Sequence, residues 1–458
     1  MIPFLTDAVH LLLRFGGWSL FAGFVYISCI CIYRLYFHPL AEYPGPLSGK
    51  LTTWRAVWHG RSGDLHVDIW RCHQKYGPIF RYAPHRVVFA SNTGFHGMDI
   101  LPNSVQQEPV LYSIPLIKEV YSTLNVFDKK VHGRKRRILS QGLCDQNLKL
   151  LEPPLLRVVD HLCDRLGEKQ DNFSPANMAE WSDFYTFDVM TELVFGRSFY
   201  TLDSNSHHYI LDGIMSQMRR MSLLTEEPMI ERLQIGRFLH PGAMAKALRF
   251  SQAGRSIMED RKRNLNPGAA DICSKLLSAK DPETGDGFPF QELSGSDTTS
   301  TAMAAAFFYL SRYPTALNKA TNEIRSGFTS IHDFRPGPFI PAGMEVGAGI
   351  YALQHNTEYF PDPFVFRPER WLQSKSKGGD GGGGVDQSAF APFSTGSRSC
   401  VGKRLAIIEF TVVLARILWR FDLGLLRGVR QGEYHTDWCF TSKKYGPYIQ
   451  YRGRKVVE

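Results

Sequence analysis

The stretch FSTGSRSCVG, Phe393 to Gly402, places one cysteine in a short run rich in glycine and serine, directly before an apolar helical pattern. Gly396 and Gly402 allow a close approach to the backbone around Cys400, which a flat and bulky group would need. The free N–H groups and the dipole of the following helix, KRLAIIEFTVVLARILWRF, favour a thiolate at this position. Arg398 adds a cation beside it. The stretch therefore predicts a thiolate that acts as a metal ligand or as a nucleophile.

Two other roles for Cys400 follow from its surroundings. A nucleophilic cysteine would need a partner histidine and an oxyanion arrangement, and the chain has no G-x-S-x-G or papain-like motif. A buried structural role is common for an isolated cysteine. The cysteine alone does not distinguish a metal ligand from a structural residue, so the interpretation depends on the surrounding motif.

The ten residues from Phe393 to Gly402 resemble, at every defined position, the F-x-x-G-x-R-x-C-x-G signature of the cytochrome P-450 superfamily of haem-thiolate monooxygenases. The resemblance implies that Cys400 is the axial ligand of a haem b iron and that Arg398 is a partner of a haem propionate. It also implies that Phe393 packs beside the ligand and shields it. In this superfamily the thiolate pushes electron density onto the iron and favours O–O cleavage.

Two further segments extend the resemblance towards the N-terminus. RLYFHPLAEYPGP, residues 34–46, is similar to the anchor-to-domain hinge of microsomal members from filamentous fungi. DKKVHGRKRRILS, residues 128–140, resembles a helix that binds one haem propionate through His132 and Arg136. A spacing of four residues puts both side chains on one helix face. RKRR by itself would equally suit a nucleic-acid patch, a role that fits poorly behind a membrane anchor.

GSDTT, residues 295–299, resembles the oxygen-activating segment in the central helix of the family. The resemblance makes Asp297 and Thr298 the pair that relays protons to bound dioxygen. Proton delivery needs a titratable group and a hydroxyl near the reacting oxygen. The same residues would also serve as an ordinary helix N-cap before AMAAAFFYL. Their occurrence together with the cysteine motif favours the catalytic role.

Two parts of the family pattern are missing, so we expect two internal deletions. FPFQEL runs directly into SGSDTTS, without the apolar first half of the central helix. No glutamate has an arginine three residues later, so the E-x-x-R helix is absent between RSGFTSIHDF and RPGPFIPAGMEV. Arg370, the structural arginine of the meander-like segment 360–371, would then be a buried and unpaired guanidinium. A gene-model error, a splice form and a decayed enzyme remain open explanations.

The N-terminal segment is apolar enough to span a membrane. Residues 15–33 carry no charge and lie between Arg14 and Arg34. A helix of this length covers the ~30 Å hydrocarbon core, and a signal peptide would have a shorter apolar stretch. We therefore expect a single transmembrane anchor, with the catalytic domain on the cytosolic face of the endoplasmic reticulum. The predicted division is a short N-terminal segment at 1–14, the anchor at 15–37, a proline hinge at 38–50 and a haem-thiolate domain at 51–458.

Periodicity predicts a mainly α protein with a minor β-sheet, that is, the cytochrome P-450 fold behind one transmembrane helix. The chain has 458 residues, 43% of them hydrophobic, enough for a large core. The eight cysteines form no C-x-x-C pair, which indicates neither a disulfide framework nor a zinc site. The predicted helices are 148–166, 181–196, 209–224, 244–263 and 405–421, the strands are 79–82, 87–90 and 345–349, and the glycine-rich stretch 374–384 is a flexible loop.

The predicted function is a haem-thiolate monooxygenase that inserts one oxygen atom from O2 into an apolar small molecule in fungal secondary metabolism. The resemblance implies electrons from NADPH through NADPH-cytochrome reductase, with cytochrome b5 as an additional donor. A basic surface at 129–137 suits an acidic reductase, and the net charge of +9 gives no sign of a nucleic-acid partner. Two alternatives stay open: a haem-thiolate enzyme of dehydration, coupling or isomerisation, and an inactive, membrane-tethered relic without the E-x-x-R helix. The substrate and the oligomeric state do not follow from the sequence.

Overall fold

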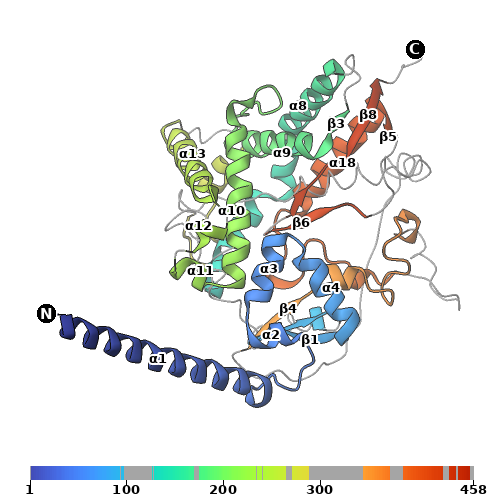
Figure 1. Cartoon of the computed structure of the whole chain (residues 1–458). Helices are drawn as coiled ribbons and strands as arrows, with labels where there is room; N and C mark the ends of the chain where they lie inside the picture. The colour runs from blue at the N-terminus through green and yellow to red at the C-terminus, as the bar shows by residue number, and fades with distance from the viewer. Residues whose placement is uncertain are drawn as a thin grey trace, which may run out of the picture.

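The computed structural model describes residues 2–92, 94–96, 126, 128–169, 175–233, 235–239, 241–264, 271–287, 344–371, 385–425, 433–439 and 442–453. The N-terminal helix α1 (Ile2–Ile32) extends away from the body of the molecule, and a short π-helix, η1 (Tyr33–Phe37), follows it (Figure 1). Together they contain a 23-residue stretch, Phe15–Phe37, that is long and apolar enough to cross a membrane. The single N-terminal apolar helix predicted from the sequence is confirmed.

The larger part of the body is helical. Its main helices are α8 (Asp145–Lys169), α9 (Met178–Phe195), α10 (His208–Glu226), α13 (Ala243–Arg263) and α18 (Lys403–Arg420). Each agrees with a predicted helix to within three residues at either end. Helices α8, α9 and α18 meet in the main hydrophobic core, while α13 packs along α10 (Figure 1). Gly196 ends α9 in the left-handed conformation, φ +68°, as expected of a helix-terminating glycine.

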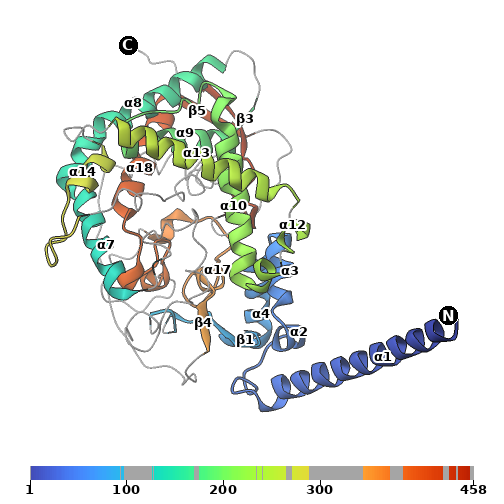
Figure 2. The same ribbon diagram turned by 90° about the vertical axis from the view of Figure 1, so that its left-hand side faces the viewer.

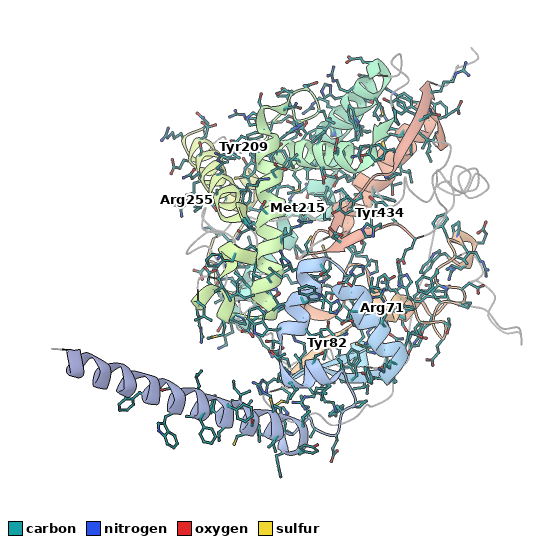
Figure 3. The ribbon with its side chains drawn as sticks, in the orientation of Figure 1. Arg71, Tyr82, Tyr209, Met215, Arg255 and Tyr434 are labelled. Carbon is teal, nitrogen blue, oxygen red and sulfur yellow. The ribbon has the colours of Figure 1, made fainter. Side chains whose placement is uncertain are left out.

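The smaller lobe surrounds a three-stranded sheet. Strands β1 (Ile79–Ala83) and β2 (Arg86–Phe89) are antiparallel, and β4 (Glu345–Ala348) runs parallel to β2. These strands confirm the three that were predicted. The lobe also contains α2 (Leu47–Leu51), α3 (Trp54–Ser62) and α4 (Leu65–Tyr76). Apolar side chains of α3 and α4 pack against β1, and α2 also contacts β1. Figure 3 labels Tyr82 of β1 in this lobe, where its hydroxyl donates to the Asp68 carboxylate at 2.8 Å.

Five further strands, four of them near the C-terminus, were not predicted. In one sheet the order is β3 (Ala176–Asn177), β8 (Tyr448–Gly453) and β5 (Phe421–Leu425), and a separate hairpin joins β6 (Thr436–Trp438) to β7 (Ser442–Lys444). All of these pairings are antiparallel. Tyr434, labelled in Figure 3 just before β6, donates to the carbonyl of Gly446 at 2.7 Å. The architecture is therefore mainly helical with small sheets, as expected.

The remaining elements are short, apart from α7 (Lys129–Gly142), which lies beside the start of α18 (Figure 2). The short ones are η3 (Asn205–His207), α11 (Met229–Arg232), α12 (Gly236–Leu239), α14 (Ile272–Ser278), α17 (Ile350–Gln354), η5 (Pro368–Trp371), η7 (Gln387–Ala389) and η8 (Gly396–Arg398). Asp297, Thr298, both expected deletion points and the glycine-rich stretch 374–384 lie outside the described residues.

Candidate functional site

The loop that carries Cys400 is a compact turn before α18. The backbone N–H of Cys400 donates to the carbonyl of Phe393 at 2.9 Å, which closes the loop. Ser394 and Gly396 both take left-handed backbone conformations, with φ of +57° and +67°. Gly402 is the N-cap residue of α18, so Cys400 lies two residues before that helix terminus, and its thiol is exposed and in no disulfide. The loop thus presents a free thiol beside a helix N-terminus, as the sequence predicted.

Helix α7 approaches this loop through Arg136. One guanidinium nitrogen of Arg136, Nη1, donates to the carbonyl of Ser399 at 2.5 Å, and Nη2 donates to the Ser399 hydroxyl at 3.0 Å. Arg398 reaches the other way, and its Nη1 donates to the carbonyl of Val126 at 3.0 Å. The two arginines therefore tie the cysteine loop to the segment that enters α7, across more than 260 residues of chain.

His132 lies in the same cationic region. It is buried, and its pKa is lowered to about 4 by burial first, then by the positive charges of Arg398 and Arg136. At neutral pH its imidazole is therefore uncharged and can donate one N–H. The sequence paired His132 with Arg136 and assigned Arg398 separately to a haem propionate, and the structure brings both arginines close enough to act on His132. Two guanidinium groups beside a neutral imidazole donor suit the carboxylate propionates of a haem.

Phe393 lies at the start of the loop, where it is half-buried. Its backbone carbonyl accepts the Cys400 N–H, and the Lys403 ammonium lies 5.7 Å from the centre of its ring. Lys403 and Ser399 were not singled out from the sequence, because both occupy undefined positions in or after the motif. Among the described residues, no three His, Cys, Asp or Glu side chains cluster in a way that could hold a metal ion.

The expectation for Arg370 is wrong. Its guanidinium donates to four backbone carbonyls, those of Pro361, Asp362, Val365 and Arg367, at 2.7 to 3.1 Å. The side chain is only partly buried, so water can also solvate it. Burial and the charge of Arg367 lower its pKa. The meander satisfies Arg370 internally because the chain from 361 to 367 curls around the guanidinium.

A cysteine loop beside two arginines and a histidine could hold a carboxylate-bearing cofactor. The cytochrome P450 family model matches residues 44–336 and 329–449, and the chain belongs to that family. It is a cytochrome P450 monooxygenase. The family implies haem-thiolate chemistry and a redox partner.

The similar proteins are fungal P450 monooxygenases. Cytochrome P450 monooxygenase apf7 of Gibberella fujikuroi is 37% identical, over 93% of this chain and 96% of its own. Cytochrome P450 monooxygenase atnE of Emericella nidulans is 33% identical over 100% of both chains. Cytochrome P450 monooxygenase poxM of Penicillium oxalicum is 33% identical over 93% of each. The resemblance therefore extends over nearly the whole length.

The length of one alignment and the split of the family match agree with the expected deletions. The comparison with atnE covers 528 positions although this chain has 458 residues, so at least 70 positions have no residue here. The family match falls into two stretches that overlap at 329–336, within the region where the sequence lacks the E-x-x-R helix. Both observations favour missing internal segments, whose positions stay a prediction.

Proposed function

We propose that this chain is a membrane-anchored haem-thiolate monooxygenase that inserts one oxygen atom from O2 into an apolar small molecule in fungal secondary metabolism. One observation carries the proposal. Arg136 and Arg398 converge with the buried, neutral His132 on the loop that presents an exposed Cys400. The fungal P450 relatives support the choice of pathway class.

Each residue of the site has a proposed role. Cys400 holds the iron, and Arg398, Arg136 and His132 bind the propionates. The bound haem supplies the activation of dioxygen. Phe393 keeps the loop closed through its carbonyl and covers one side of the thiolate. Asp297 and Thr298 are proposed to deliver protons towards the substrate pocket, because a carboxyl and a hydroxyl in sequence can pass a proton to a reacting oxygen.

The proposal also includes a membrane location and redox partners for the chain. Residues 15–37 form a single-pass anchor, 38–50 the hinge and 51–458 the catalytic domain, which faces the cytosol from the endoplasmic reticulum. NADPH-cytochrome reductase, with cytochrome b5 as a second donor, is proposed to dock on the first turn of α7, where Lys129 and Lys130 are exposed. Deleting residues 1–37 should release the protein from membranes, and carbonate-resistant association after the deletion would contradict the anchor.

The main experiment tests the ligand. The full chain, expressed with haem supply, should give a reduced carbon monoxide complex that absorbs at the thiolate position. Cys400→Ala should abolish that band, because no other thiolate can take its place in the loop. Cys144→Ala, which removes a half-buried cysteine from the turn between α7 and α8, is the matched control and should keep the band. A band retained in Cys400→Ala would overturn the assignment.

A second candidate function is an inactive, membrane-tethered relic, and the 70 or more positions missing relative to atnE favour it. The two candidates differ in turnover. An active enzyme binds haem stoichiometrically and consumes NADPH and O2 when substrate and reductase are present. The relic purifies largely without haem, and a version restored from genomic sequence regains the haem. Transcript reads that continue through an E-x-x-R helix would assign the gap to the gene model.

A further inference from the structure

A second group of cationic side chains lies outside the haem site, where the anchor helix meets the body. We define it as the junction cluster: Arg34, His38, Lys50, Arg81 and His85. Its members come from η1, the hinge, α2, β1 and the turn between β1 and β2. In Figure 1 this region is the lower end of the small lobe, next to the end of α1, and Figure 3 marks it by Tyr82, the neighbour of Arg81.

Arg81 is the fixed centre of the junction cluster. Its side chain is fully buried, and Nη1 donates to the carbonyls of Arg34 and Leu40 at 2.8 and 3.5 Å. Nε and Nη2 both donate to the carbonyl of Pro84, at 3.2 and 2.8 Å. Gly45 is pressed against the Arg81 backbone, where an added Cβ would lie 2.1 Å from the carbonyl oxygen. These contacts hold the hinge rigidly on β1.

The other members are held around Arg81. Arg34 Nη1 donates to the carbonyl of Leu51 at 2.5 Å, which brings its guanidinium to the C-terminal end of α2, the helix that carries Lys50. Nδ1 of the buried His38 accepts the N–H of Leu40 at 3.0 Å, so its proton is on Nε2, which donates to Nδ1 of His85 at 3.1 Å. The side chains of Arg34 and Lys50 are half-buried and so keep donors that can reach solvent.

The positive charge of the junction cluster is not balanced by ion pairs within the described part of the chain. There, no carboxylate lies within ion-pair distance of Arg34, Lys50 or Arg81, whose bonds go to backbone carbonyls. Glu345, whose charge acts on His85, is bonded to Arg86 at 2.6 Å.

The positive charges of the junction cluster lower the pKa values of two of its members. Burial and then Arg81 lower the pKa of Lys50, while burial, Arg81, His85 and Arg34 lower the pKa of His38 to about 4. Glu42, the only acid in the hinge, is exposed and contributes to neither shift. A bound anion would relieve this repulsion, as the propionates would at His132.

The position of the junction cluster indicates the source of the anion. It begins where the apolar stretch Phe15–Phe37 ends. Tyr36 and Phe37 are 73% and 72% exposed, and Leu47, one turn before Lys50 on α2, is 61% exposed. Aromatic and basic residues at the end of a membrane span lie at the level of the lipid headgroups. A phosphate group at the level of the lipid headgroups belongs to a phospholipid.

We propose that the junction cluster binds the phosphate of an anionic phospholipid, with Arg34 and Lys50 as direct donors and Arg81 as the buried cation behind them. The inference rests on the membrane anchoring proposed above. A guanidinium offers a planar pair of donors to phosphate oxygens and an ammonium a point charge, so the two groups are complementary. Bound lipid would fix the orientation of the catalytic domain on the membrane, because Arg81 makes the hinge rigid.

The test measures lipid retained by the full-length protein. Protein extracted from membranes in mild detergent is titrated with short-chain phosphatidic acid or phosphatidylcholine, and bound lipid is counted by native mass spectrometry. Arg34→Gln/Lys50→Gln removes two charges but keeps amide donors for the structural bonds. It should weaken phosphatidic acid binding roughly 30-fold, at about 1 kcal/mol per charge. Lys149→Gln/Arg452→Gln removes two exposed charges from α8 and β8 and should leave binding unchanged.

The outcomes separate this proposal from the anchoring on which it rests. Equal binding of phosphatidylcholine and phosphatidic acid, or equal loss in both double variants, would overturn the proposal. Displacement of the lipid by inorganic phosphate at equal concentration would assign the site to free phosphate and overturn the lipid source. Extraction of the wild-type protein by carbonate would instead refute the anchor. Circular dichroism of the two double variants checks that both are folded.

Discussion

The cysteine loop and the junction cluster lie in different parts of the molecule and share one electrostatic arrangement. Each contains a buried histidine whose pKa is lowered to about 4, His132 in one and His38 in the other. In each, two arginines lower the pKa of the histidine, and these arginines donate to backbone carbonyls. A nearby anion stabilises buried positive charge, so both regions are suited to bind an external anion.

The difference between the two regions lies in how their arginines are fixed. Arg81 is fully buried and joins segments up to 47 residues apart, so the junction is rigid before any ligand binds. Arg136 is half-buried and reaches a loop of small residues around Ser399. That loop has little stiffness of its own, and its conformation depends on the contacts it receives. The comparison indicates a preformed anion site at the junction and a site at Cys400 that the cofactor completes.

The largest expected effect is at the junction. Arg81→Ala should lower the free energy of unfolding by about 3 kcal/mol, because the carbonyls of Arg34, Leu40 and Pro84 each lose the guanidinium as a donor. Pulse proteolysis in urea and detergent measures this change. Arg71→Ala, at an exposed arginine on α4 of the same lobe (Figure 3), is the control and should change stability by less than about 0.5 kcal/mol. Equal effects would show that Arg81 does not hold the hinge.

The second expectation concerns pH. The folded-state pKa of His38 and of His132 is about 4, below the ordinary 6.5, so the unfolded chain takes up protons first as the pH falls. Stability that is present above pH 6.5 should therefore be lost towards pH 4, by about 1 to 2 kcal/mol for each histidine. Unfolding of the haem-free, lipid-free protein at a series of pH values measures the loss.

Single variants assign this pH dependence to the two regions. His38→Asn and His132→Asn should each remove a part of the slope between pH 6.5 and 4. The slope that remains belongs to other histidines such as His73, whose pKa burial also lowers to about 4. Haem should suppress the part of the pH dependence that His132 contributes, because a nearby anion raises the pKa of a histidine. Phosphatidic acid should suppress the part that His38 contributes, for the same reason. Suppression of both contributions by one ligand would show that the two regions are not separate anion sites.

The third expectation concerns the cysteine loop. Arg136→Gln should raise the rate of haem loss roughly tenfold, since one charged hydrogen-bonding group that holds Ser399 is replaced by a neutral one. Transfer of haem to an acceptor globin gives the rate. The control is Arg134→Gln, on the same helix, whose side chain bonds the carbonyl of Gly287 at 3.1 Å and not the loop. An unchanged rate of haem loss in Arg136→Gln would show that Arg136 of α7 does not support the loop.

The smallest expected effect is at Arg370. Its acceptors lie within nine residues of it, whereas Arg81 also reaches Arg34, 47 residues away. The side chain of Arg370 is partly exposed. Arg370→Ala should therefore cost the whole protein about 1 kcal/mol or less, while faster hydrogen exchange appears in residues 361–371 alone. A global loss as large as that of Arg81→Ala would mean that the meander, too, is tied to distant parts of the chain.

Features encoded within a few consecutive residues were predictable. The ten-residue motif located Cys400 and Arg398, and a spacing of four paired His132 with Arg136. Apolar periodicity placed the five main helices to within three residues, and an uncharged run located the apolar N-terminal helix. Each of these signals depends on a local repeat or spacing, which side-chain chemistry imposes on the sequence itself.

Long-range pairings were not predictable. Strand β8 joins β3 across more than 270 residues, Ala176 opposite Ile449, and neither short strand carries a strong alternation of its own. The unpaired guanidinium expected at Arg370 was wrong because its acceptors are carbonyls of the chain that curls around it. The sequence by itself determined which side chains can ligate, carry charge or enter a membrane. Only the tertiary structure decided what holds Arg81, Arg136 and Arg370, because every residue has a backbone carbonyl and folding alone selects the ones that accept.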